Sequence, residues 1–107
     1  MKDTPMSIRL NELNFEREVL RSSDPVLVDF YGDFCKPCMM IAPLIEELAG
    51  ELIGKAKVGK VNVSENPRLA AAYQINAVPT FLIFKNAQIV ERLAGVQPKS
   101  RLVEALA

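Results

Sequence analysis

Hydrophobic residues along the chain change from one spacing to another, and the changes predict strands and helices in turn. Residues 26–31 form an apolar and β-branched run interrupted only by Asp29, which is typical of a buried strand. After Asp33, apolar residues recur every three to four positions and predict one face of a long helix: Ile41, Ile45, Leu48, Ala49 and Leu52. Glu46, Glu47 and Glu51 lie mostly off that face. Gly54 is predicted to close this helix, and Pro43 to kink it.

The other segments are shorter and follow the same reasoning. Strands are predicted at 7–10, 58–63, 80–84 and 88–93, the last two joined by a hairpin-sized connection. Asn14 is predicted to cap a helix over 15–21, and Pro67 to begin a short helix. Pro98 opens a final helix with an apolar face of Leu102, Val103 and Leu106. The order β-α-β-α-β-α-β-β-α predicts an α/β fold whose sheet is covered by helices on both faces.

Length and charge limit how many domains the chain can form and which kinds of partner it can bind. The 107 residues fit one domain, 1–107, and 13 Lys and Arg balance 13 Asp and Glu. A neutral chain offers no electrostatic reason to bind nucleic acid or an acidic membrane. The first ten residues lack the roughly 7–15 apolar residues of a secretory signal, and no run approaches the roughly 18 of a membrane helix. A cytoplasmic location is therefore expected, and removal of a leader from the sequence is the alternative.

The cysteines limit the chemistry. The chain has two, spaced Cys35-Lys36-Pro37-Cys38, and no histidine. Two cysteines are too few for a secreted disulfide framework or for a tetrahedral zinc site within one chain, so no metal is expected. Two ordinary reduced cysteines, or half of a metal site shared between subunits, are the alternatives. A Cys-x-x-Cys between a strand and a helix favours redox chemistry over both.

The position of each cysteine predicts its role. Residues three apart on a helix share a face, so the two sulfurs can reach bonding distance. Cys35 begins the helix, where free N–H groups and the helix dipole lower a thiol pKa from about 8.5 towards roughly 3.5–7.5. Cys38 lies deeper. Cys35 is therefore expected to attack a substrate disulfide, and Cys38 to resolve the mixed disulfide.

From about Phe15 onward the sequence resembles the thioredoxin family. The family pattern Val-Asp-Phe-Trp-Ala-x-Trp-Cys-Gly-Pro-Cys is matched by Val-Asp-Phe-Tyr-Gly-Asp-Phe-Cys-Lys-Pro-Cys over 28–38. Further matches follow in the family's order: Met40-Ile41-Ala42-Pro43, Lys60, Val78-Pro79-Thr80, Phe84-Lys85-Asn86 and Gly95. Several separated motifs in order are more specific than a lone Cys-x-x-Cys.

The resemblance implies a thioredoxin-like fold, a central five-stranded mixed sheet flanked by four helices. The first three strands would be parallel, and the last two would be added antiparallel. It also implies that Pro79 is cis and faces the cysteines, and that the backbone beside it pairs with the substrate chain. Phe34, Ala77, Val78 and Gly95 would complete a flat apolar docking surface. A proline that merely starts an edge strand is the alternative for Pro79.

Asp29 matches the family's buried aspartate behind the cysteines. Burial should raise the pKa of this carboxyl, so that it can exchange a proton with Cys38, through water, during resolution. Lys60 matches a lysine near that aspartate and would oppose the shift. A purely structural aspartate at a strand end is the alternative.

The sequence also departs from the family pattern. Tyr31 and Phe34 replace both tryptophans, Ser64 replaces an aspartate, and Ala87 replaces the usual hairpin glycine. Lys36 stands where the family has glycine, and together with Pro37 it is expected to tune the redox potential. A cation beside the Cys35 thiolate stabilises the dithiol, which should raise the potential by tens of millivolts at most, about 30 mV per 1.4 kcal/mol.

These observations predict a thiol–disulfide oxidoreductase that reduces protein disulfides. It would need no cofactor, would receive electrons from a reductase, and would act as a monomer. A dedicated electron carrier for one partner, or a non-catalytic binding module built on the same fold, are the alternatives. A scaffold would need neither cysteine, nor Asp29, nor Pro79.

Overall fold

Each segment that the hydrophobic pattern assigns to a strand or a helix is one in the structure. The computed structural model describes residues 6–107 and holds, within them, five strands and four helices. In chain order these are β1 (Ile8–Leu10), the π-helix η1 (Glu16–Leu20), β2 (Val26–Tyr31), α1 (Lys36–Glu51), β3 (Lys57–Asn62), α2 (Pro67–Ala72), β4 (Thr80–Lys85), β5 (Gln88–Ala94) and α3 (Lys99–Leu106).

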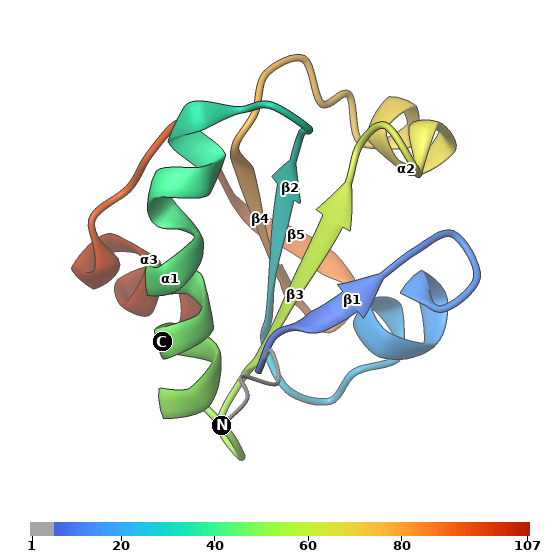
Figure 1. Ribbon diagram of the computed structural model, residues 1–107. Helices are drawn as coiled ribbons and strands as arrows, with labels where there is room; N and C mark the ends of the chain where they lie inside the picture. Colours follow the sequence, from blue (N-terminus) through green and yellow to red (C-terminus); the bar gives the residue numbers. More distant parts are fainter. Residues whose placement is uncertain (1–5) are drawn as a thin grey trace.

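The strands form one mixed sheet in the order β1-β3-β2-β4-β5 (Figure 1). β1, β3 and β2 run parallel, β4 pairs antiparallel with β2, and β5 pairs antiparallel with β4. The expected five-stranded mixed sheet with four helices is confirmed. β2 lies in the centre and is paired along both edges, so the site that follows it is carried by a strand with a neighbour on each side.

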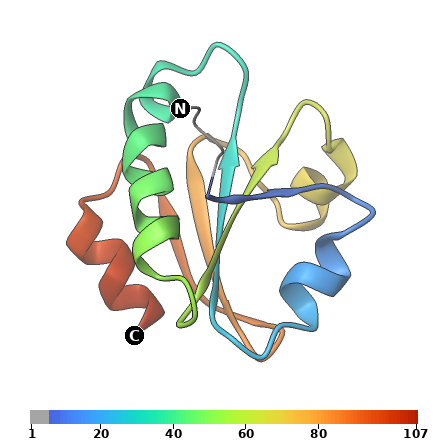
Figure 2. The same ribbon diagram turned by 60° about the horizontal axis from the view of Figure 1, so that its bottom comes forward.

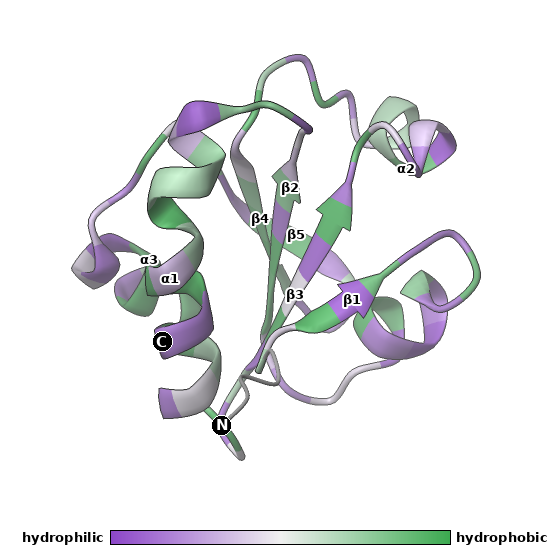
Figure 3. Ribbon diagram, in the orientation of Figure 1, coloured by the Kyte–Doolittle hydropathy of each residue, from purple (hydrophilic) through white to green (hydrophobic). Residues whose placement is uncertain are grey.

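Helices cover both faces of the sheet, as Figures 1 and 2 show. α1 and α3 pack on one face, and their buried residues form a cluster with Leu27, Val58, Phe81 and Ile83 of the sheet. η1 and α2 lie on the other face, where the core contains Val28, Phe30, Leu82 and Phe84. In Figure 3 the hydrophobic colour follows β2 and β4 through the middle of the molecule, between these two helical layers. Each face therefore has its own hydrophobic core.

Two predictions about helix ends were wrong. Asn14 does not cap the first helix; its Oδ1 accepts a hydrogen bond from the Asn11 N–H at 2.8 Å, while Asn11 Oδ1 accepts from the N–H groups of Leu13 and Asn14. This reciprocal pair closes the turn that leads into η1, and the N-cap of η1 is Phe15, without a side-chain cap. The long helix ends with Leu52 as its C-cap, and Gly54, with φ +86°, lies in the turn beyond.

In α3 the third buried residue is Ala105, and not Val103 as predicted. Leu102, Ala105 and Leu106 are buried, whereas Val103 is 40% exposed. Leu102 and Leu106 lie one turn apart; Ala105, on one side of this pair, joins the core, whereas Val103 lies on the other side. Pro43 does lie inside α1, and the kink expected there stays a prediction.

The hairpin between β4 and β5 turns through Asn86 and Ala87, both with positive φ, +53° and +69°. Two left-handed residues in a two-residue loop are typical of the turn that fits the twist of a hairpin. An alanine in this conformation is strained by its Cβ, by about 1–2 kcal/mol. The chain therefore accepts a small cost where glycine would fit without one.

Candidate functional site

The site begins where the central strand ends. β2 leads into Gly32-Asp33-Phe34, and α1 starts immediately afterwards with Cys35 as its N-cap. Phe34 has φ +58° and a ring that is 98% exposed. Asp33 Oδ1 accepts a hydrogen bond from Asn62 Nδ2 at 3.0 Å, which ties this loop to the end of β3. The loop is thus held at one side and presents an apolar ring to solvent beside the first cysteine.

Cys35 and Cys38 form a disulfide across the first turn of α1, with Cα atoms 5.2 Å apart. The Cys38 N–H donates to Cys35 Sγ at 3.2 Å. Cys35 is half-buried, and Cys38 is only 6% exposed. Pro37 lies in the first turn of the helix, where a missing N–H costs no hydrogen bond. The sulfur of Cys35 is therefore the more accessible one and lies at the helix end that favours negative charge.

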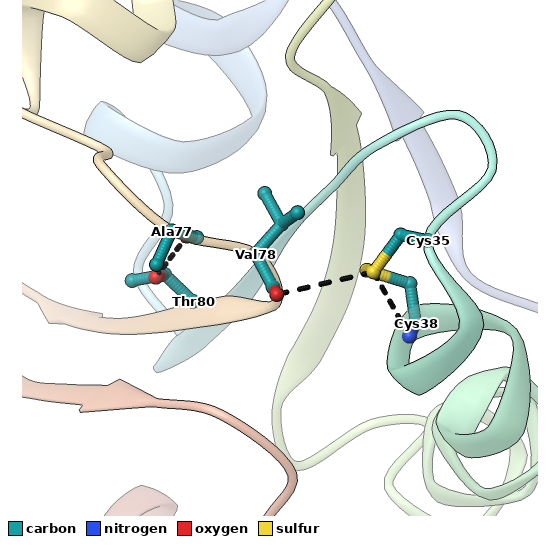
Figure 4. The surroundings of a disulfide bond; sticks show 5 residues. All are labelled: Cys35, Cys38, Ala77, Val78 and Thr80. Carbon is teal, nitrogen blue, oxygen red and sulfur yellow. Dashed lines mark hydrogen bonds between the residues drawn. A yellow bond between two sulfur atoms is a disulfide. The ribbon is translucent and has the colours of Figure 1, made fainter.

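The segment that precedes β4 faces these sulfurs (Figure 4). The Val78–Pro79 bond is cis, and the carbonyl oxygen of Val78 lies 3.9 Å from Cys35 Sγ. The Thr80 hydroxyl donates to the Ala77 carbonyl at 2.7 Å, and the Gly95 N–H donates to the Pro79 carbonyl at 2.8 Å. The structure thus brings Val78 and Pro79 to the disulfide and links them to Ala77 and Gly95, all four of which the sequence analysis named.

Asp29 is two residues from Leu27 on β2, so both side chains point to the same face of the sheet. Leu27 belongs to the core under α1, and Asp29 therefore lies on the face that α1 covers. It is 2% exposed, and its Oδ1 has no hydrogen-bond partner among the described residues. Burial raises the pKa of this carboxyl to about 7; the charge of Lys60 opposes the rise, and that of Glu46 adds to it. Such a carboxyl can hold or release a proton near neutral pH.

Lys60 is the register partner of Asp29 on β3. Its ammonium lies 4.7 Å from the centre of the Tyr31 ring, close enough for a cation–π interaction. A hollow of about 250 Å³ runs beside it, lined by Tyr31, Gly32, Asp33, Phe34, Cys38, Met39, Ala42 and Lys60. This hollow connects the buried cysteine with the lysine that opposes the Asp29 shift, and its size allows water to enter.

The sequence analysis did not identify Glu46 as part of the site. Glu46 is half-buried on α1 and accepts hydrogen bonds from the N–H groups of Met6 and Ser7 at 2.8 and 2.9 Å. Burial acts to raise the pKa of Glu46, but the Ser7 hydroxyl, these two N–H groups and the charge of Lys60 together outweigh it, so that the pKa is lowered. With Lys60 and Tyr31 it lines a second hollow of about 240 Å³. Glu46 lies eight residues after Cys38, just over two helical turns, and this spacing is the sequence signal that could have placed it near the site.

Lys36 does not join the group around Asp29. Its side chain is exposed, and within residues 6–107 it forms no ion pair. The same residues contain no cluster of three or more His, Cys, Asp or Glu side chains that could hold a metal ion. No helix among them is both long enough and apolar enough to cross a membrane.

Comparison with known proteins agrees with this geometry. The thioredoxin family model matches residues 6–107. The chain is 46% identical to thioredoxin 2 of Chlorobaculum tepidum over 93 residues, which cover 87% of this chain and 85% of that protein. It is 45% identical to thioredoxin 1 of a Nostoc species over 98 residues, 92% of each chain, and 42% identical to the thioredoxin of a Synechocystis species over 106 residues, 99% and 96% of the two chains. The chain belongs to the thioredoxin family of thiol–disulfide oxidoreductases.

Proposed function

We propose that Cys35 is the nucleophile of the reaction and Cys38 the resolving thiol. In the reduced protein the Cys35 thiolate attacks one sulfur of a substrate disulfide and displaces the other substrate sulfur as a thiolate. Cys38 then attacks Cys35 Sγ, which releases the second substrate thiol and leaves the Cys35–Cys38 disulfide. Two electrons pass from the protein to the substrate. The observation that carries this assignment is the place of Cys35 at the N-cap of α1, half-buried, with the N–H of Cys38 aimed at its sulfur.

Asp29 is the proton acceptor for Cys38 in the second step. A thiol must lose its proton before it can attack, and Cys38 is only 6% exposed to bulk solvent. A carboxylate with a pKa of about 7 can accept that proton near neutral pH, whereas one with the usual pKa of an aspartate would be a much weaker base. Lys60 limits how far the pKa rises, and the hollow between Lys60 and Cys38 gives water a route between the groups.

The docking surface consists of Phe34, Ala77, Val78, Pro79 and Gly95. The Val78 carbonyl beside Cys35 Sγ can pair with the N–H of a substrate chain that runs past the disulfide, in the manner of an added strand. The exposed ring of Phe34 offers apolar contact on the other side of the sulfur. Lys36 and Pro37 tune the redox potential from between the cysteines.

The wider role follows from this chemistry. The thioredoxin family acts on disulfide-containing proteins and is reduced by a reductase. This chain acts as a monomeric electron carrier of one domain over residues 1–107, which maintains the redox balance of the cytoplasm. Its two cysteines are fully used by one reversible disulfide, which suits a compartment where thiols are kept reduced.

Reduction of insulin disulfides by the Cys35→Ser and Cys38→Ser variants tests the assignment. Cys35→Ser should abolish reduction, and Cys38→Ser should accumulate a mixed disulfide with its substrate, visible by mass spectrometry. Limited alkylation of the reduced protein at neutral pH should modify Cys35 first. Alkylation that went first to Cys38, or a mixed disulfide trapped by Cys35→Ser, would reverse the two roles.

A further inference from the structure

Arg92 lies on the edge strand β5, close to the docking segment, and no part of the reaction described above uses it. Its neighbour Leu93 packs against the core under α1 and α3, so Arg92 lies on the opposite face of the sheet, with α2. Its Nη2 donates to the carbonyl oxygens of Tyr73 and Gln74 at the end of α2, the second bond being 3.2 Å long. Two backbone carbonyls therefore fix the guanidinium in one position.

The remaining donors of this guanidinium are free within the described residues. Arginine has five N–H donors, and both carbonyl bonds come from Nη2 alone. Nε and Nη1 make no hydrogen bond, and Arg92 forms no ion pair, in residues 6–107. Most other arginines of this part of the chain pair with a carboxylate, as Arg9, Arg17, Arg21 and Arg101 do. Arg92 is a fixed cation that lacks such a partner.

A hollow of about 320 Å³ lies in front of it, lined by Gln74, Asn76, Ala77, Thr80, Arg92 and Ala94. Ala77 and Thr80 flank the cis Val78–Pro79 bond, whose Val78 carbonyl faces Cys35 Sγ. The polar lining consists of two amides, a hydroxyl and the guanidinium, with no carboxylate among these residues. The hollow therefore joins a positive charge to the rim of the docking surface.

We propose that this hollow is a subsite for an acidic side chain of the substrate, held by Arg92, within a few residues of the substrate cysteine. The inference rests on the proposed docking of the substrate chain beside Val78. A paired strand advances about 3.3 Å per residue and sends alternate side chains to opposite faces. Ala77 is one residue from Val78 and Thr80 is two, so a neighbouring substrate side chain can reach the hollow. A planar guanidinium with free N–H groups suits a carboxylate, which it can bind through two parallel hydrogen bonds.

Synthetic peptides with a single cysteine, each joined to an identical copy through a disulfide, provide the test. One residue is varied among Glu, Gln and Lys at each of the three positions on either side of the cysteine, and kcat/KM is measured from the thiols released. At one position the Glu peptide should be reduced about two- to fivefold faster than the Gln peptide, the range expected for an exposed ion pair. The ratio should shrink at high salt.

Variants show which arginine causes the preference for the Glu peptide. Arg92→Gln should bring the Glu-to-Gln ratio of kcat/KM to about one, and Arg92→Glu should favour the Lys peptide instead. Arg68→Gln, which removes an exposed arginine of α2 that lines a different hollow, is the matched control and should keep the wild-type ratio. A wild-type protein that reduces the Gln peptides but prefers Glu at no position, or a preference that survives in Arg92→Gln, would overturn the subsite alone. Failure to reduce any peptide would overturn the proposed docking as well.

Discussion

Asp29 and Phe30 are neighbours on the central strand and are both buried, yet they point into two different cores. Phe30 enters the core of η1 and α2, where Phe15, Tyr73 and Phe84 also gather and the ring of Phe30 lies 6.3 Å from that of Tyr73. Asp29 enters the core of α1 and α3, where its Oδ1 finds no hydrogen bond in the described part of the chain. Phe30 stabilises the fold, whereas burial of the Asp29 carboxylate opposes it.

The difference between the two residues separates a face with charged groups near the disulfide from a face of apolar packing. The face with Asp29 also carries Lys60, Glu46 and the helix that begins at the disulfide. The other face contains aromatic and aliphatic packing. A carboxylate left without partners in a core is expensive, and its presence on one face only supports the proton transfer proposed for Asp29.

The largest expected effect comes from the aromatic face. Phe30→Ala should lower the free energy of unfolding by about 3–5 kcal/mol, because it removes a fully buried ring and leaves a cavity. Urea unfolding measures this loss. The pH dependence of disulfide reduction by the remaining folded protein should not change. A shift of that pH profile would show that the two faces are not independent.

Asp29→Asn should raise the free energy of unfolding, whereas Phe30→Ala lowers it. Because the pKa of Asp29 is raised from 3.8 to about 7, the folded protein keeps a proton that the unfolded chain has lost between these pH values. Stability therefore falls as pH rises from about 4 to about 7. Asparagine removes this penalty, so the variant should be more stable than the wild type by about 2–4 kcal/mol above pH 8 and by little near pH 4. Urea unfolding across this range checks the sign, and a variant that is less stable at pH 8 would contradict it.

Glu46→Gln tests whether the acid on α1 belongs to the charged group around Asp29, because it should change the pKa of Asp29. The charge of Glu46 raises the pKa of Asp29, so its removal should lower that pKa, and isotope-edited NMR of the Asp29 carboxyl would detect the change. Glu47→Gln is the matched control, because Glu47 pairs with Lys99 at the surface, 3.4 Å away. If the pKa of Asp29 is the same in the two variants, the charge of Glu46 does not act on Asp29.

A smaller effect is expected at the hairpin, away from both cores. Ala87→Gly should raise the free energy of unfolding by up to about 1 kcal/mol, because glycine adopts the φ of +69° without Cβ strain. Insulin reduction should be unchanged. A loss of stability would mean that the entropy of glycine in the unfolded chain outweighs the strain that it relieves.

The smallest expected effect is that of Lys36→Gln, which keeps the length of the side chain and removes its charge. The redox potential should fall by tens of millivolts at most, at about 30 mV per 1.4 kcal/mol, because the Cys35 thiolate loses a nearby cation. Equilibration with glutathione at low and high salt measures the difference. An equal or higher potential in the variant would remove Lys36 from redox tuning.

Local patterns in the sequence predicted most of the fold and the core of the site. Periodicity, the continuous apolar run at 26–31 and the positions of prolines predicted the strands and helices, and the strand–Cys-x-x-Cys–helix order predicted where the disulfide lies. The sheet topology and the cis Pro79 were implied by the resemblance to the family. The misses at Asn14 and Val103 are shifts of one and two positions within correctly predicted helices, where neighbouring residues compete for a cap or a buried face. Such choices depend on packing against the rest of the molecule, which periodicity does not contain.

Contacts between distant segments could not be predicted. Glu46 binds the backbone of Met6 and Ser7, about forty positions earlier, and Arg92 binds the end of α2 from an edge strand. The spacing of Glu46 from Cys38 does not reveal its contact with Met6 and Ser7, and nothing in the residues around Arg92 marks it as different from other surface charges. Only the folded chain shows that one lies near Asp29 and the other beside the docking segment.

The rate at which Cys38 resolves a mixed disulfide, measured against pH, tests most directly whether the buried carboxylate serves the reaction. A single-turnover experiment starts from the mixed disulfide between Cys35 and a peptide and follows release of the peptide thiol from pH 5 to 9. In the wild type the rate should rise through a step near pH 7, where Asp29 loses its proton. In Asp29→Asn that step should be absent and release near neutral pH should be slower. Identical rates and profiles in the two proteins would show that Asp29 takes no part in resolution.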